Sequence, residues 1–242
     1  MTVLLRLQAV GKNFGGLAAV NNVSFDMKDG EIVGLLGPNG SGKTTLLNLI
    51  SGAHRATSGN ISLYGKNISS LRPDQISHSG IARTFQLVRV LQTMSVSDNV
   101  ICSVAFREKS AWGREAHEIA EEKLATVGLQ DKARDLAGSL NYIDCKRLEL
   151  ARALATEPKL LLLDEWLSGL TPQELETGIE LINSIQSSGI SILIVEHIMS
   201  AIRELCPRCV VMNSGEVIAD GPTGEVLENE SVVSAYLGGA DA

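Results

Sequence analysis

Basic residues are scarce in this chain of 242 residues. Lysine and arginine number 21 against 28 aspartates and glutamates, a formal net charge of −7. No run of basic residues occurs, and surfaces for duplex nucleic acid and polybasic lipid anchors both depend on clustered positive charge. The charge therefore predicts a protein or small-molecule partner and no nucleic acid. The length predicts one globular domain with room for a sub-lobe.

Long apolar runs and cysteine are scarce as well. No segment approaches the roughly 20 consecutive apolar residues of a membrane span. The N-terminus lacks the pattern of a signal peptide, which predicts a cytoplasmic location. The four cysteines make no disulfide framework in a chain this long. Cys206 and Cys209 form a C-x-x-C pair at the wrong end of a helical stretch for a reactive thiolate, so we interpret them as packed side chains rather than a redox or zinc site.

Hydrophobic patterning predicts an α/β fold with a mainly parallel sheet. Strands are expected over 3–10, 20–26, 31–36, 160–163, 190–195 and 210–212, and helices over 43–51, 114–127, 145–155, 172–187 and 199–205. The order strand, helix, strand over 160–195 is typical of parallel strands. Residues 93–156 show helical spacing and few strand signals, which indicates a helical subdomain inserted in the core.

The most specific motif is a phosphate loop at residues 37–44, between a buried strand and a helix. It reads Gly37-Pro38-Asn39-Gly40-Ser41-Gly42-Lys43-Thr44, which fits G-x-x-x-x-G-K-[ST]. The glycines let backbone N–H groups form an anion nest at the helix N-terminus. Lys43 is expected to reach the β- and γ-phosphates and Thr44 to ligate Mg²⁺, and we add Thr45 to the binding residues. The alternative is a glycine-rich turn that precedes a helix by chance.

An acidic pair follows the predicted strand 160–163. Asp164 is placed to hold Mg²⁺ through water, and Glu165 to polarise an attacking water. The alternative for the pair is an acidic N-cap after a strand. Together with the phosphate loop, the pair predicts ATP binding and hydrolysis with Mg²⁺.

With these two motifs the sequence resembles the nucleotide-binding subunit of ABC transporters over essentially its whole length. Within that family it is similar to the LivG type, which serves importers of branched-chain and other hydrophobic amino acids. Besides the two motifs, the matching stretches are Phe14-Gly15-Gly16-Leu17, Val20-Asn21-Asn22-Val23-Ser24-Phe25, Asn48-Leu49-Ile50-Ser51-Gly52, Gly80-Ile81-Ala82-Arg83-Thr84-Phe85-Gln86, Val195-Glu196-His197 and Ala235-Tyr236-Leu237-Gly238.

The resemblance implies a P-loop NTPase fold of ABC type with an N-terminal antiparallel β region. It implies a single ATP-binding domain over 1–242, with a nucleotide-binding core at 1–92 and 157–242 and a helical subdomain at 93–156. It also implies that Phe14 stacks on adenine, that Gln86 senses the γ-phosphate and Mg²⁺, and that His197 contacts the γ-phosphate. An aromatic face, an amide and an imidazole can each play such a part.

The segment before the helix at Arg147 departs from the family pattern. Members usually carry L-S-G-G-Q, or L-P-Y-G-Q in this branch, where this chain has Leu140-Asn141-Tyr142-Ile143-Asp144. Ile143 replaces a glycine, and a β-branched residue lacks the freedom that lets backbone approach a phosphate. Trp166 replaces a common proline, and Thr171 stands where Asp or Asn is usual.

The resemblance also implies two subunits packed head to tail, each ATP being held by one phosphate loop and the other subunit's signature segment. The site built on Lys43, Asp164, Glu165 and His197 would then be competent if a partner supplies a good signature. The site closed by Asn141, Tyr142, Ile143 and Asp144 would be degenerate, which favours a heterodimer over a homodimer. Permease subunits would attach the protein to the inner face of the membrane, with an extracytoplasmic binding protein as an indirect partner.

Two other functions stay open from the sequence. A soluble ABC protein acting on ribosomes or DNA usually has two cassettes, a long coiled-coil insertion or basic patches, and this chain shows none of them. A nucleotide-binding regulator with weak or no hydrolysis is favoured by Ile143. The transported substrate cannot be read from the chain.

Overall fold

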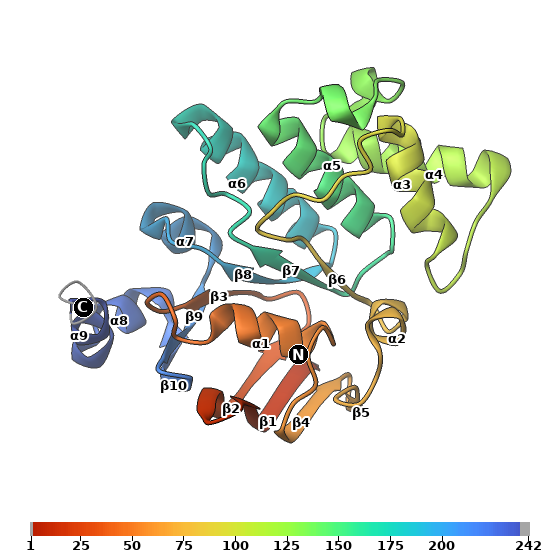
Figure 1. Ribbon diagram of the computed structural model, residues 1–242. Helices are drawn as coiled ribbons and strands as arrows, with labels where there is room; N and C mark the ends of the chain where they lie inside the picture. The colour runs from red at the N-terminus through yellow and green to blue at the C-terminus, as the bar shows by residue number, and fades with distance from the viewer. Residues whose placement is uncertain (1, 238–242) are drawn as a thin grey trace.

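The computed structural model describes residues 2–237, with the side chain of Leu237 left out, and shows two sheets with helices around them (Figure 1). Gly238, the last residue of the C-terminal stretch quoted above, lies outside the described residues. One sheet has four antiparallel strands in the order β2-β1-β4-β5, and the other has six strands in the order β10-β9-β3-β8-β7-β6.

The antiparallel sheet is the N-terminal β region that the resemblance implies. Its strands are β1 (Val3–Phe14), β2 (Leu17–Lys28), β4 (Ser58–Leu63) and β5 (Lys66–Asn67). The first two strands are longer than predicted, because they pair as one hairpin up to the turn at Gly15-Gly16, where Phe14 lies opposite Leu17. This hairpin brings Phe14 beside the start of the first helix.

The six-stranded sheet forms the centre of the molecule, as Figure 1 shows. Its parallel strands are β9 (Arg208–Asn213), β3 (Ile32–Leu36), β8 (Ser191–Val195), β7 (Leu160–Asp164) and β6 (Ile81–Arg83), and β10 (Glu216–Pro222) runs antiparallel to β9. All five residues of β3, β7 and β8 are buried, as expected for strands covered on both faces. The prediction of a parallel sheet is confirmed.

Alternate residues of the central strands enter two different cores. Val33, Leu35 and Leu162 pack with the antiparallel sheet and with α1 (Lys43–Ile50), which lies between the two sheets. Ile32 and Leu161 pack on the other face, against the helices. This alternation fixes the face of the sheet to which each side chain points.

Residues 96–154 contain helices and no named strand, as the sequence predicts. They form α3 (Val96–Ala105), α4 (Gly113–Thr126), the 3₁₀ turns η1 (Gln130–Lys132) and η2 (Ala137–Ser139), and α5 (Tyr142–Leu154). Helix α5 begins three residues earlier than predicted, because the Asn141 side chain accepts the N–H of Asp144 and caps it. The division of the chain at 92/93 and 156/157 stays a prediction.

The remaining helices surround the sheet. They are α2 (Pro73–His78), α6 (Pro172–Ser187), α7 (Met199–Leu205), α8 (Thr223–Glu228) and α9 (Glu230–Leu237). Thr171 caps α6 in a reciprocal arrangement with Glu174, which accounts for a hydroxyl residue at this position. Among residues 2–237, none of the helices combines the length and apolar character that a bilayer crossing requires.

Cys206 and Cys209 are buried free thiols. Cys206 follows the last residue of α7, and burial raises its pKa, which opposes thiolate formation. The Cys209 thiol lies 3.1 Å from the Thr223 hydroxyl inside the core. Within residues 2–237 no cluster of three or more metal-ligating side chains is found. The burial of both thiols fits packed side chains, and the absence of a redox or zinc role stays a prediction.

Candidate functional site

The phosphate loop joins β3 to α1 in the predicted manner. Gly42 precedes the helix with a φ of 103°, and Gly37 has a φ of 143°. A Cβ atom on Gly37 would lie 2.1 Å from the Met212 carbonyl oxygen, and one on Gly42 would lie 2.4 Å from the Ala19 carbonyl oxygen. Both positions therefore require glycine for space as well as for conformation.

Lys43 is buried inside the loop that it follows. Its ammonium donates to the carbonyl oxygens of Gly37 at 2.8 Å and Pro38 at 3.0 Å. Burial lowers the pKa of Lys43, and the negative charges of Glu165 and Asp164 oppose that shift. The buried Ser41 hydroxyl has no hydrogen-bond partner among the described residues. A cation, an unpaired hydroxyl and a helix N-terminus in one concave loop fit the phosphates of a nucleotide.

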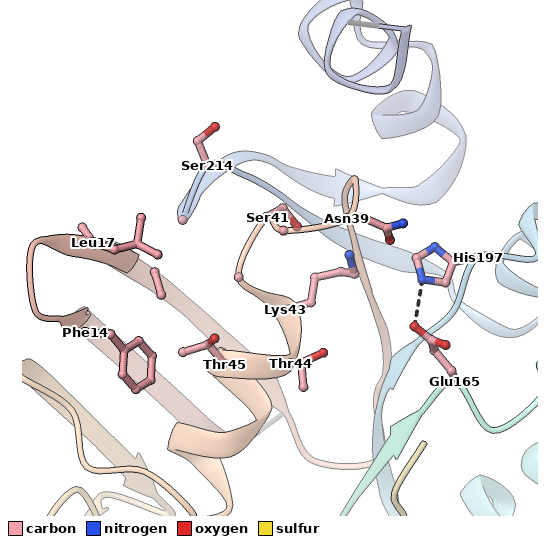
Figure 2. A pocket seen from close by; sticks show the side chains of 15 residues that line it. Phe14, Leu17, Asn39, Ser41, Lys43, Thr44, Thr45, Glu165, His197 and Ser214 are labelled. Carbon is pink, nitrogen blue, oxygen red and sulfur yellow. Dashed lines mark hydrogen bonds and ion pairs between the residues drawn. The ribbon is translucent and has the colours of Figure 1, made fainter. Parts of the chain in front are cut away.

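A cavity of about 600 Å³ opens beside the loop. Figure 2 shows Phe14 and Leu17 on one side of Lys43, with Glu165 and His197 on the other. Its lining includes most of the predicted binding residues and some unpredicted ones: Phe14, Leu17, Ala18, Ala19, Asn39, Gly40, Ser41, Gly42, Lys43, Thr44, Thr45, Glu165, His197, Ser214 and Gly215. Gly37, Pro38, Gln86 and Asp164 are not among the lining residues.

The Phe14 ring is held at the surface rather than in a core. It is 44 % exposed, meets His54 edge-on with ring centres 5.3 Å apart, and has the Lys12 ammonium 4.9 Å from its centre. One side of a flat apolar ring therefore remains free to stack on a planar group, as the adenine prediction requires.

The three predicted catalytic residues converge, although they come from separate segments. Glu165 follows β7, Gln86 lies beyond β6 and His197 follows β8. The Gln86 amide donates to one Glu165 carboxylate oxygen at 2.8 Å, and His197 Nε2 lies 3.0 Å from the other. Glu165 has a φ of 51°, a left-handed conformation unusual for a residue other than glycine.

Asp164 is the last residue of β7 and is buried. One carboxylate oxygen accepts from the Arg83 guanidinium at 2.8 Å, and Arg83 also donates to the Asn48 side chain at 2.6 Å. Arg83 had no predicted role, because no local pattern in the sequence indicates that β6 lies next to β7. The pair keeps the charge of Asp164 compensated at the sheet edge.

Residues 141–144 do not line the cavity of their own chain. Tyr142 is 54 % exposed at the start of α5, whereas the Asp144 side chain is buried and pairs with Lys132 and Arg147. The Asn141 side-chain oxygen accepts the N–H of Asp144 and so caps α5. Helix α5 lies among the other helices of this part of the chain, α3 and α4, in Figure 1.

Comparison with known proteins decides the family. The profile described as ABC transporter matches residues 20–168. The chain belongs to the ABC transporter family. A second profile, described as branched-chain amino acid ATP-binding cassette transporter, matches residues 216–242 of this cassette. ATP-binding proteins of this family are ATPases coupled to transport, and so is this chain.

The cassette is similar over nearly its full length to characterised relatives. It is 38 % identical over 253 residues to the high-affinity branched-chain amino acid transport ATP-binding protein LivG of Salmonella typhimurium, covering 98 % of each chain. It is 35 % identical to BraF of Pseudomonas aeruginosa, again covering 98 % of each. A crystal structure of the ADP conformation of an ATP-binding cassette of an ABC transporter matches with a TM-score of 0.91 and 30 % identity, over 98 % of this chain and 100 % of that one.

Tyr236 connects the C-terminal helix of the cassette to the phosphate loop. Its hydroxyl accepts the N–H of Gly37 at 2.8 Å. Tyr236→Phe leaves this N–H without its partner, and we expect a loss of about 1 kcal/mol, seen as a melting temperature lower by about 3 °C. Tyr64→Phe is the matched control, because the exposed Tyr64 hydroxyl bonds to Asp29 at the surface. Equal melting temperatures for the two variants would contradict this role.

Glu196, beside His197, makes the stability of the cassette depend on pH. Burial raises the pKa of Glu196 from 4.5 to about 7. The folded state therefore binds this proton more tightly, and its stabilising contribution is complete below pH 4.5 and lost as the pH rises through about 7. Glu196→Gln removes this loss of stability at high pH, because the glutamine amide does not ionise. We expect the difference in unfolding free energy, variant minus wild type, to rise by about 3 kcal/mol between pH 4.5 and 8.5. Urea titrations at each pH measure it. Parallel pH profiles would contradict this assignment.

Proposed function

We propose that this chain is the ATP-binding and hydrolysing subunit of an ABC importer for branched-chain or other amino acids or amides. The observation that carries the proposal is the Glu165 carboxylate, held between Gln86 and His197 at the mouth of the phosphate loop. The substrate class rests on the names of the similar LivG and BraF proteins. Such a subunit works on the cytoplasmic face, attached to the membrane through permease subunits, with an extracytoplasmic binding protein as a more distant partner.

Different residues bind the phosphates, the adenine and the Mg²⁺ ion of Mg-ATP. Backbone N–H groups within residues 39–44, with Thr45 and the Lys43 ammonium, bind the phosphates, while Phe14 stacks on adenine. Thr44, Gln86 and Asp164 offer the oxygen donors that suit Mg²⁺. When bound, Mg²⁺ neutralises charge on the phosphate oxygens.

Hydrolysis depends on where the proton of the attacking water goes. The Glu165 carboxylate accepts that proton while the Gln86 amide donates to one of its oxygens and His197 Nε2 lies 3.0 Å from the other. His197 then donates toward the γ-phosphate, where negative charge develops. The neighbouring Arg83–Asp164 pair fixes the end of β7, and with it the starting point of the Glu165 loop.

The dimer is proposed to be asymmetric. A similar cassette, 25 % identical with a TM-score of 0.81, has a dimeric post-hydrolysis structure bound to ADP and Pi. In a head-to-tail dimer, residues 141–144 would face the partner's nucleotide, and Ile143 gives that site a poor signature. A heterodimer then has one strong site, built on Lys43 and Glu165 of this chain. Glu165→Gln here is expected to cost far more turnover than the matching change in the partner, and equal losses would contradict asymmetry.

Ile143 also favours a second candidate function, a nucleotide-binding regulator with weak or no hydrolysis. Affinity purification of the tagged chain from membranes, followed by an ATPase assay of the isolated complex, separates the two. We expect membrane permeases to co-purify and the complex to hydrolyse ATP. A complex that contains permeases and binds ATP without turnover would favour the regulator, and recovery with ribosomes or DNA instead would overturn both.

A further inference from the structure

A buried cation holds the loop that follows Glu165. Lys146, on α5, is only 2 % exposed. Its ammonium donates to the carbonyl oxygens of Trp166 at 2.8 Å and Ser168 at 2.7 Å, and it lies 3.3 Å from that of Glu165. The contact is reciprocal, because the Trp166 indole N–H donates to the Lys146 carbonyl oxygen at 3.2 Å. Residues 165–168 are thus fixed to the first turns of α5.

A buried anion holds the same loop from the other direction. Glu196 is 1 % exposed and accepts the N–H of Leu167 at 2.6 Å, with the Ser168 hydroxyl at 3.4 Å from its other oxygen. The Lys146 ammonium therefore donates to carbonyl oxygens of the loop, and the Glu196 side chain accepts one of its N–H groups. Neither side chain lines the nucleotide cavity, so their effect on chemistry passes through the loop.

The loop needs this support because Glu165 adopts a costly backbone conformation. A φ of 51° at a residue other than glycine persists only when the surroundings determine it. The Glu165 N–H donates to the Val195 carbonyl oxygen at 2.9 Å, while its own carbonyl oxygen faces Lys146. The two peptide groups that flank the Glu165 Cα atom are therefore both fixed, and the direction of the Glu165 side chain follows.

We propose that Lys146 is a positioning residue for ATP hydrolysis, which sets the orientation of Glu165 by binding the backbone of residues 165–168. This inference rests on the proposed function, in which Glu165 receives the proton of water. It further makes the first turns of α5 and the Glu165 loop one mechanical unit, so that a displacement of α5 changes the geometry of hydrolysis.

The decisive variant is Lys146→Met, which keeps the length of the side chain and removes its donors and charge. In the complex with its partner subunits we expect kcat to fall about 30-fold, since small misplacements of a catalytic group cost up to about 100-fold. The KM for ATP should stay within about twofold, because the phosphate loop is untouched. Lys146→Arg, which retains a cation and donors, should recover most of kcat. Lys123→Met, on α4, is the matched control.

Lys146→Met also removes a positive charge that favours the ionised form of Glu196 and so alters the stability of the buried loop, and a second variant therefore separates positioning from stability. Lys146→Met combined with Glu196→Gln removes both buried charges and is expected to restore thermal stability while kcat stays low. If this double variant recovers both thermal stability and kcat, Lys146 is structural only and the inference is overturned. Trp166→Phe, which deletes the indole donor and puts a smaller ring in a buried position, should lower kcat by about threefold with the fold intact.

Glu165→Gln and Lys146→Met together distinguish a wrong positioning role for Lys146 from a wrong proposed function. If Glu165→Gln leaves turnover intact, the proposed role of Glu165 is wrong, whatever Lys146 does. If Glu165→Gln abolishes turnover and Lys146→Met keeps a normal kcat, only the positioning role is wrong. Hydrogen exchange gives a readout without turnover: the Leu167 amide should exchange faster in Lys146→Met, and unchanged protection would overturn the inference.

Discussion

Replacing Glu165 with glutamine is expected to reduce steady-state ATP hydrolysis by the complex at least about 100-fold, with ATP binding intact. The amide has nearly the same shape as the carboxylate, and its oxygen still accepts the hydrogen bond from Gln86 that is now 2.8 Å long. It cannot take a proton from water at neutral pH. Glu165→Gln therefore removes the proton acceptor while leaving the phosphate loop in place.

The measurement is phosphate release together with an equilibrium ATP-binding assay on the same preparation. Glu180→Gln, at an exposed position of α6, is the matched control and should behave as the wild type. Turnover within tenfold of the wild type in Glu165→Gln would show that another group accepts the proton. Loss of binding and turnover together would show instead that Glu165 belongs to the nucleotide-holding part of the site.

Lys43→Met is expected to weaken ATP binding about 100-fold, because the charge-assisted contact between a buried ammonium and phosphate is lost. The Lys43 ammonium already lies inside the loop, bonded to the Gly37 and Pro38 carbonyl oxygens at 2.8 and 3.0 Å. Its burial means that methionine fills the space without a new cavity. The variant should therefore remain folded and lose affinity.

Calorimetric titration with Mg-ATP checks this result on the single chain, since the loop, cation and Phe14 all come from one subunit. A thermal shift supports it, because a ligand that binds only the folded state raises the melting temperature. The wild type should melt higher with ATP and Lys43→Met should not. Lys28→Met, at the exposed end of β2, is the control. Wild-type affinity in Lys43→Met would contradict the assignment of residues 37–44.

Those parts of the site that are contiguous in sequence could be predicted before the fold was known. The phosphate loop, Asp164 and Glu165 stand at ends of short buried strands, and strand ends at one sheet edge meet in space. Gln86 and His197 needed the family resemblance, because one amide and one imidazole carry little information alone. The structure brings both to within 3.0 Å of Glu165.

The supporting residues could not be predicted, because their contacts join segments far apart in the chain. Tyr236 reaches Gly37 across 199 positions, and Lys146, which lies inside the predicted helix 145–155, reaches carbonyl oxygens 19 to 22 positions further along the chain. Ser214 joins the cavity wall only because the β9–β10 hairpin returns to the loop at residue 41. No local pattern encodes such contacts, which depend on tertiary packing.

The central claim is that ATP hydrolysis at the Glu165 site drives import. The most direct test reconstitutes the purified complex in vesicles with its binding protein and measures ATP hydrolysis and uptake of a labelled branched-chain amino acid in the same preparation. We expect substrate to stimulate hydrolysis, and Glu165→Gln in this chain to abolish hydrolysis and uptake together. Uptake that continues at the wild-type rate in Glu165→Gln, or hydrolysis that never depends on substrate, would contradict the account.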